Sequence, residues 1–257
     1  MRIEQRTTSL IFVLILIFST ILVMIPALPV SSAYNETSVG TITGTEEWQG
    51  VHTLQGDIVV AEGATLIIHA GTTVNFPNGA FIDVEGALCA GSSACGANPA
   101  STGSPVRFIW TDAPVSNQTG RCYSATGNPD LNCGEGMILR STVDTALTKF
   151  SFVTFDGAYG TPTFIQSNNN WAFGALMFDG ASVETDHLTF SNINTSNIVI
   201  FDSAAPSITD GTFVLGTDGQ GWDASSIRAY EAGLGILSTL RITNSAFTGN
   251  PQAECGT

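Results

Sequence analysis

Short runs of β-branched and aromatic residues alternate with glycine-containing turns over most of the chain. The first such runs cover residues 57–60, 64–68, 73–76 and 81–84, and Glu-Gly, Ala-Gly and Asn-Gly pairs separate them. Runs of this length and composition favour β-strands, and the glycine pairs mark the turns between them. No longer stretch after the N-terminal segment shows the period of about 3.6 residues of an amphipathic helix. The pattern predicts an all-β protein built from short strands.

Similar segments recur about every 23 residues, which indicates a repeat. The matched segments are residues 62–64 with 85–87, residues 178–180 with 201–203, and Phe190 with Phe213. A longer separation links Phe201 to Tyr230, and residues 216–223 are the expected inserted loop. Repeats of one fixed period are typical of stacked units that bury their inner faces against each other. We therefore predict a solenoid whose coils advance by one strand spacing, about 4.8 Å, and form parallel sheets.

The opening coils resemble those of right-handed parallel β-helix proteins. Residues 56–76 contain two patterns that are common in that group, Val-x-Glu-Gly-Ala-Thr-Leu and then Gly-Thr-x-Val-x-Phe. Residues 207–213 and 240–247 are similar to the ladder-forming coils of the same group. The resemblance, to secreted or surface members of the pectin-lyase-like superfamily, implies an all-β, right-handed parallel β-helix. It implies no single activity, because this fold supports adhesins, surface-layer components, polysaccharide lyases and hydrolases.

The N-terminal segment, residues 1–33, has the features of an export signal. Arg2 and Arg6 precede an apolar run over residues 10–25, and a small-residue cleavage site follows at residues 31–33. The apolar run is short for a membrane-spanning helix unless it extends to Val30. Two alternatives stay open, namely cleavage of the signal or its retention as an N-terminal membrane anchor. In both, the remaining chain is expected to be secreted or displayed at the cell surface.

The exported part is expected to consist of a short N-terminal segment followed by the β-helix. Residues 34–55 form the expected cap or linker, and residues 56–257 form the coils. Trp48 is expected to plug the open N-terminal end of the core. After Phe247 the sequence shows no capping repeat, so we expect the β-helix to be truncated at its C-terminal end.

Five cysteines fit an oxidising compartment. Cys89 with Cys95 and Cys122 with Cys133 are the preferred disulfides, because each pair is close in sequence and brackets a polar excursion. Neither spacing is that of a zinc site. Cys255 has no assigned partner, and the sequence alone leaves the connectivity open.

The charge balance of the chain narrows the choice of partners. The chain has 22 acidic and 8 basic residues, a formal net charge of −14, and 43% hydrophobic residues. The acidic surplus argues against nucleic acid as a partner, and the hydrophobic content argues against a disordered chain. The acidity either keeps the surface hydrated or binds cations. Asn117 and Asn194 are the preferred N-glycosylation acceptors, because Asn35 lies close to the cleavage site.

The first strands of four repeat units align to give a column of outward side chains. Alternation places four residues on the outer face, namely Arg140, Phe178, Phe201 and Tyr230. Arg228 lies beside Tyr230. Aromatic rings flanked by arginines can stack on sugar rings or hold a protein, so these five are the candidate ligand-binding residues. The alternative is that inserted loops cover the column, because parallel sheets are normally covered on both faces.

Three acidic residues, Asp179, Asp202 and Glu231, follow this column in register. Carboxylates stacked about 5 Å apart would repel one another, and a bound cation or a raised pKa would relieve the repulsion. They are the weak catalytic candidates, since paired carboxylates also serve glycoside hydrolysis. The simpler alternative is that they cap turns or face solvent where the strands end.

One polar loop is a weak candidate for binding Ca²⁺. Its alternating oxygen-bearing residues are Asn128, Asp130, Asn132 and Glu135. The loop glycine, Gly134, falls one place late for the usual calcium loop. No other metal or cofactor is expected, because the three histidines are scattered along the sequence. The pair Asp186-His187 predicts no catalytic triad without further geometry.

These observations favour an exported, non-enzymatic β-helix module that acts as a structural or adhesive ectodomain at the cell surface. Its expected partners are glycans or other surface proteins, and it would meet a membrane only through the N-terminal segment. The alternative is a polysaccharide lyase or glycoside hydrolase of the β-helix class. Such an enzyme needs a carboxylate pair, or a carboxylate with Ca²⁺ and a basic residue, on an exposed groove, and only Arg140 and Arg228 are expected near the acidic residues Asp179, Asp202 and Glu231.

Overall fold

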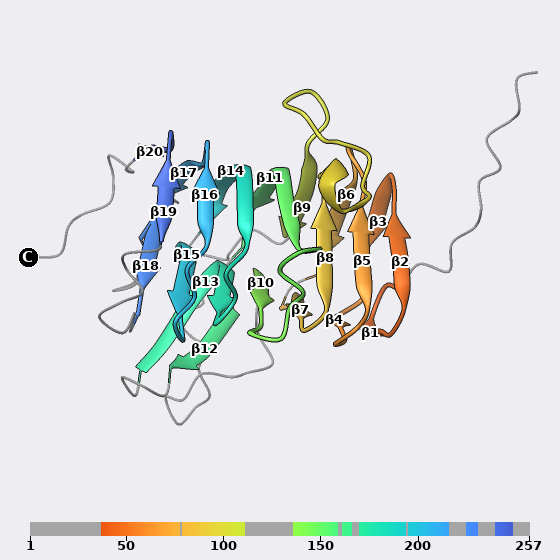
Figure 1. Ribbon diagram of the computed structural model, residues 1–257, viewed down its shortest axis with the longest axis horizontal. Helices are drawn as coiled ribbons and strands as arrows, with labels where there is room; N and C mark the ends of the chain where they lie inside the picture. Colours follow the sequence, from red (N-terminus) through yellow and green to blue (C-terminus); the bar gives the residue numbers. More distant parts are fainter. Residues whose placement is uncertain are drawn as a thin grey trace, which may run out of the picture. The chain divides into compact units, whose positions relative to one another are not determined.

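The strands of the protein follow one another as successive coils of a solenoid (Figure 1). The computed structural model describes residues 37–77, 79–110, 136–158, 161–165, 170–193, 195–215, 225–230 and 240–248. All of them belong to the unit that spans Glu36–Thr257. The predictions that lie outside the described residues concern the export signal, Asn35, Asn117, Asn194, Cys122, Cys133, Cys255, Glu231, and the loop with Asn128, Asp130, Asn132 and Glu135.

The first of two sheets contains one strand from each coil. Its order is β1 (Gly40–Ile42), β4 (Ile58–Val60), β7 (Phe81–Val84), β10 (Gly136–Leu139), β13 (Asn170–Asp179), β15 (Ser196–Phe201) and β18 (Ile227–Ala229). All of these neighbours pair in parallel. A short strand, β12 (Thr161–Ile165), adds an antiparallel hairpin to β13. Each neighbour in this sheet therefore lies one coil further along the chain.

The second sheet is parallel throughout its described strands and has two limbs joined at a corner. The first limb contains β2 (Thr45–Trp48), β5 (Thr65–Ile68), β8 (Ala87–Ala90), β11 (Lys149–Asp156), β14 (Glu184–Ile193), β16 (Ser207–Thr209) and β19 (Arg241–Thr243). The second limb contains β3 (Val51–Thr53), β6 (Thr73–Phe76), β9 (Val106–Trp110), the later halves of β11 and β14, β17 (Thr212–Leu215) and β20 (Ala246–Thr248). Each coil thus has three sides, and the fold is the all-β, parallel β-helix that the sequence predicts.

Local sequence explains the early strands. β5 and β6 read Thr-Leu-Ile-Ile and Thr-Val-Asn-Phe, and both alternate half-buried with fully buried positions. β-Branched and aromatic residues suit such strands because they pack well on a pleated, half-buried surface. The strands predicted within residues 57–84 are all present. β1 to β3, where a cap or linker is expected, form the first coil, and Trp48 is fully buried within it.

Coil length varies more than a single period allows. Phe190 and Phe213, which are one period apart, are paired in register as predicted. Leu176 pairs with Ile198, so this coil is one residue shorter than the period, whereas the next coil is longer and pairs Ile198 with Ile227. Insertions between strands account for the longer separations, and they leave the pairing of the strands unchanged.

An aromatic ladder fills the inside of the second limb. Its members are Phe108, Phe155, Phe190, Phe213 and Phe247, one from each successive coil. Consecutive ring centroids are 5.3, 5.1, 5.4 and 4.8 Å apart. All but Phe247 are fully buried, and aromatic pairs at such distances contribute about 0.5–1.5 kcal/mol beyond the area they bury. The regular aromatic column of this protein is therefore inside the coil.

The disulfide predicted between Cys89 and Cys95 is confirmed, with a Cα–Cα distance of 5.7 Å. It lies at the start of an insertion between β8 and β9 that contains a short 3₁₀-helix, η1 (Ser93–Cys95). Disulfides of this kind form and persist in oxidising compartments. Within the part of the chain that the structure describes, no helix is long and apolar enough to cross a membrane.

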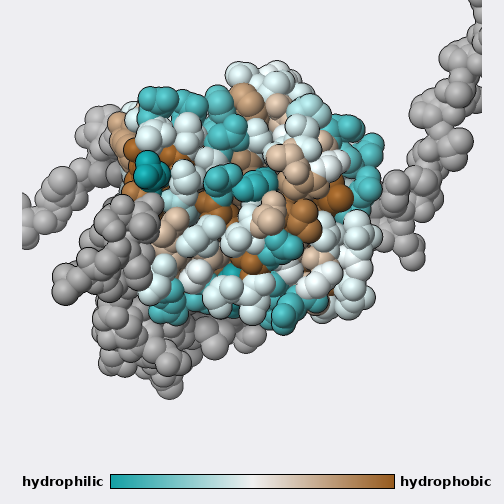
Figure 2. Space-filling model, in the orientation of Figure 1, coloured by the Kyte–Doolittle hydropathy of each residue, from teal (hydrophilic) through white to brown (hydrophobic). Residues whose placement is uncertain are grey.

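The outward positions of the coils are mainly polar. Figure 2 shows polar and neutral side chains over most of the visible described surface, with apolar ones in separate patches. Along β11 and β14, the positions between the buried residues hold threonine, serine, aspartate, asparagine and histidine, with Phe152 as the apolar exception. The outer face of the second sheet is consequently a source of hydrogen-bonding groups.

Candidate functional site

The predicted outward column of aromatic side chains on the first sheet is not formed. Phe178 pairs with Leu139 on one side and Ile200 on the other, and it is fully buried in the main core. The prediction set Phe178 opposite Phe201, whereas Asp179 is the residue opposite Phe201. The error arises because this coil is one residue shorter than the period, and a shift of one residue moves a strand side chain to the other face.

The remaining aromatic residues of the column are packed into a second apolar cluster. Phe201 is 2% exposed and packs with Ile138, Met177 and Val199 on the outer side of the first sheet. Tyr230 packs against this cluster, and its hydroxyl accepts a hydrogen bond from Arg228 Nη1 at 2.9 Å. The burial of Phe201 supports the alternative prediction, in which this face of the sheet is covered and is not open to a ligand.

Arg140 bridges two carboxylates on the same outer face. Its Nε and Nη2 donate to Asp83 at 2.9 and 2.7 Å, and its Nη1 donates to Asp179 at 3.0 Å. These hydrogen bonds hold the pKa of Arg140 above its ordinary value. Burial raises the pKa of Asp179, Arg140 opposes that rise, and the neighbouring Asp202 adds to it.

The predicted acidic ladder is thus partly neutralised by an arginine. The neighbouring Asp202 raises the pKa of Asp179, while Glu231 lies outside the described residues. Among the described residues, no group of three histidine, cysteine or acidic side chains is arranged to hold a metal ion. Arg140 offsets the charge of Asp83 and Asp179, whereas Asp202 still raises the pKa of Asp179.

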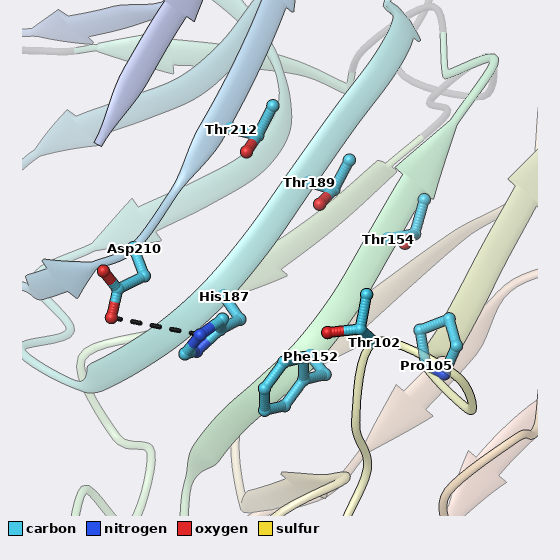
Figure 3. Close-up of a pocket in the computed structure, with 8 residues that line it drawn as sticks. All are labelled: Thr102, Pro105, Phe152, Thr154, His187, Thr189, Asp210 and Thr212. Atoms are coloured by element: carbon cyan, nitrogen blue, oxygen red, sulfur yellow. Dashed lines mark ion pairs between the residues drawn. The ribbon is translucent and has the colours of Figure 1, made fainter. Parts of the chain in front are cut away.

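A hollow of about 240 Å³ lies on the outer face of the second limb (Figure 3). Its lining residues are Thr102, Pro105, Phe152, Thr154, His187, Thr189, Asp210 and Thr212. They come from three successive coils and from the insertion that precedes β9. We call this hollow the threonine groove.

The floor of the threonine groove is a row of threonines. Thr154 of β11 pairs with Thr189 of β14, which pairs with Thr212 of β17. Neighbouring threonines in this row lie on adjacent strands, so their side chains repeat at about 4.8 Å along the coil axis. Each threonine offers a hydroxyl that donates and accepts hydrogen bonds, beside a methyl group.

One rim of the groove is the corner between the two limbs. Phe152, His187 and Asp210 occupy this corner in successive coils, with φ values of 50°, 49° and 54°. The left-handed backbone lets a single residue turn the chain, and the next residues, Val153 and Leu188, point into the core. This conformation costs a residue with a Cβ about 1–2 kcal/mol, and histidine and aspartate visit it more often than phenylalanine does.

His187 is held in place from three sides. Its ring stacks on Phe152 with centroids 4.0 Å apart and planes at 20°. Its Nδ1 is 3.4 Å from Asp186 Oδ2, and its Nε2 is 4.0 Å from Asp210 Oδ2, the pair marked in Figure 3. The side chain is 40% exposed, so the fixed ring still presents a face and an edge to a ligand.

The insertion before β9 closes one end of the groove with Thr102 and Pro105. The Cys89–Cys95 disulfide fastens the start of this insertion. His69 fastens its middle, because its Nδ1 accepts from the Asn98 backbone at 2.8 Å and its Nε2 contacts Glu47 at 3.0 Å. The wall of the groove is therefore tied to the coils beneath it.

The threonine groove is not among the sites predicted from the sequence, although one signal for it exists. The repeat that matches Phe190 with Phe213 also matches Thr189 with Thr212 and His187 with Asp210 at the same separation. The separation of Thr154 from Thr189 is longer, so the hairpin of β12 and β13 hides their match from a fixed period. His187 gains its partners mainly from neighbouring coils.

The groove combines three kinds of contact for a polar ligand. Threonine hydroxyls form its floor, the Phe152–His187 stack gives an aromatic surface at the rim, and Asp210 supplies a carboxylate acceptor. Comparison of the chain with protein-family models, with curated proteins and with solved structures finds no match. The function is therefore inferred from the geometry.

Proposed function

We propose that this chain is an exported, non-enzymatic β-helix module of the pectin-lyase-like type that binds glycans at the cell surface. The observation that carries the proposal is the threonine groove, where a fixed ring stack lies beside a row of hydroxyls. Export is supported by the signal-like N-terminal segment and by the Cys89–Cys95 disulfide.

Sugar rings have an apolar C–H face and a rim of hydroxyl groups. The exposed part of the Phe152–His187 stack suits the apolar face, because aromatic rings offer large, rigid contact area. Thr154, Thr189 and Asp210 suit the hydroxyl rim, because they provide both donors and acceptors. Few, well-placed polar groups beside apolar surface are the usual composition of a small-molecule site.

Binding without cleavage fits the charges in the groove. Glycoside hydrolysis generally uses two carboxyl groups that flank the scissile bond. Asp210 is the one carboxylate among the described lining residues, and it faces His187. The alternative, a lyase or hydrolase, is favoured only by Asp179 and Asp202, which interact beside Arg140 on the first sheet.

The test is a panel of immobilised polysaccharides probed with the purified full chain, with parallel assays for reducing ends and unsaturated products. We expect binding to at least one neutral polysaccharide and no product. His187→Asn should weaken binding about tenfold or more, a loss of at least about 1.4 kcal/mol. Asparagine tolerates the left-handed backbone at this position, so the variant should keep its fold.

Thr41→Val is the matched control, because Thr41 is an exposed threonine of β1 on the other sheet. It should bind as the unchanged chain does. Absence of binding to every polysaccharide would contradict the proposal. Release of product that Asp202→Asn abolishes would favour the enzyme instead.

A further inference from the structure

The threonine groove is periodic along the coil axis. Figure 3 shows Thr154, Thr189 and Thr212 in one row, with Phe152, His187 and Asp210 in a second row beside it. Each coil therefore contributes one floor residue and one rim residue to the groove. A ligand with its own repeat along this axis would meet similar contacts at each step.

The floor row has a defined length. Before Thr154, the register position belongs to Arg107, and after Thr212 it belongs to Ala246. Arg107 replaces the short hydroxyl side chain with a long charged one, and Ala246 has no hydroxyl. The insertion with Thr102 and Pro105 stands at the Thr154 end as well. The hydroxyl floor thus spans three coils.

The charges disfavour an anionic ligand. Among the described lining residues, Asp210 and His187 are the ionisable ones, and Asp186 lies 3.4 Å from His187. Arg107 adjoins the Thr154 end of the row but does not line the groove. The whole chain has a formal net charge of −14. A polymer of uronic acids would meet repulsion from the chain and from these carboxylates, because like charges facing each other across an interface oppose association.

We infer that the groove takes an uncharged, linear glycan that lies along the coil axis, with three successive sugar units over Thr154, Thr189 and Thr212. The inference rests on the proposed glycan-binding function and adds the ligand's charge, shape and length. The rim differs at each step, since the first unit meets the Phe152 ring, the second meets His187 and the third meets Asp210. The glycan is therefore bound in one direction.

Linking several weak contacts on one chain raises affinity, because later contacts form at a high effective concentration. A single sugar reaches one floor residue and one rim residue, while a trisaccharide reaches all three pairs. Affinity should therefore rise steeply up to three units and then stop rising.

The experiment is isothermal titration of the full chain with neutral β-1,4-linked gluco-, xylo- and manno-oligosaccharides of one to five units. Trigalacturonate is the charged counterpart of the trisaccharides. For at least one neutral series we expect about a tenfold or greater gain in affinity from one to three units, and less than about twofold from three to five. The neutral trisaccharide should bind at least about tenfold tighter than trigalacturonate.

Thr189→Val tests the middle of the floor with a nearly isosteric change. It should lower trisaccharide affinity several-fold, while Thr41→Val leaves that affinity unchanged and both variants keep the unfolding midpoint of the parent chain. Equal affinity for one and three units, continued gains up to five units, or tighter binding of trigalacturonate would each overturn the inference. Those results would leave glycan binding itself intact, whereas no binding to any oligosaccharide or polysaccharide would refute both proposals.

Discussion

Asp179 carries a carboxylate whose surroundings disfavour its charged form. Burial raises its pKa above the ordinary value of 3.8; Arg140 lowers the pKa by a smaller amount, and Asp202 raises it further. The folded protein therefore holds a proton on Asp179 more tightly than the unfolded chain does. Between 3.8 and the raised pKa, the contribution of Asp179 to the free energy of unfolding falls as pH rises.

Asp179→Asn removes this titration. The free energy of unfolding of the variant minus that of the parent should increase as pH is raised from about 3 to about 7, and then level off. Urea denaturation at a series of pH values measures this difference. A difference that decreases over the same range would contradict the assignment.

Glu184→Gln provides a control of opposite sign. Lys149 Nζ donates to Glu184 at 2.8 Å and lowers the pKa of that carboxyl group. Its stabilising contribution is present above the ordinary carboxyl pKa and is lost as pH falls, so here the variant-minus-parent difference should decrease as pH rises. Glu184 is largely exposed, so the effect should be small and weaker in high salt.

The ring ladder inside the second limb links each coil to the next through apolar contacts. Phe190 lies in its middle, fully buried between Phe155 and Phe213. Phe190→Ala should lower the free energy of unfolding by about 3–5 kcal/mol, because it removes a large side chain and leaves a cavity between stacked rings. Chemical denaturation monitored by circular dichroism measures this loss.

Phe247→Ala is the control within the same ladder. Phe247 is 52% exposed and stacks on Phe213 alone among the described rings. Phe247→Ala should lower the free energy of unfolding clearly less than Phe190→Ala does, because the Phe247 ring buries less apolar area. Equal costs at the two positions would show that the ladder does not act as a buried stack.

The elements differ in how far local sequence determines them. β4 to β7 are predictable because each is a short β-branched or aromatic run between glycine turns. The inward direction of Phe178 is not predictable from the fixed period, because a coil shorter by one residue reverses the face of every side chain. Strand existence is a local property, whereas the face of a side chain depends on the length of the whole coil.

At the scale of the whole unit, the candidate site depends on stacking that no single segment specifies. Thr154, Thr189 and Thr212 do not stand out in the sequence, and they become a row only when coils of unequal length are paired. The disulfide at Cys89 and Cys95 was predictable, because it closes a short local loop. The groove wall that the same insertion provides was not predictable, because Thr102 and Pro105 line the groove together with residues from later coils.

The threonine groove is the proposed binding site for a glycan. Methyl NMR of the threonine-labelled full chain, titrated with the tightest-binding neutral trisaccharide, tests this most directly. We predict that the largest shift changes fall on Thr154, Thr189 and Thr212, while Thr41 stays unchanged. Shift changes that leave these three threonines unaffected, while the ligand binds, would place the site elsewhere and contradict glycan binding in the threonine groove.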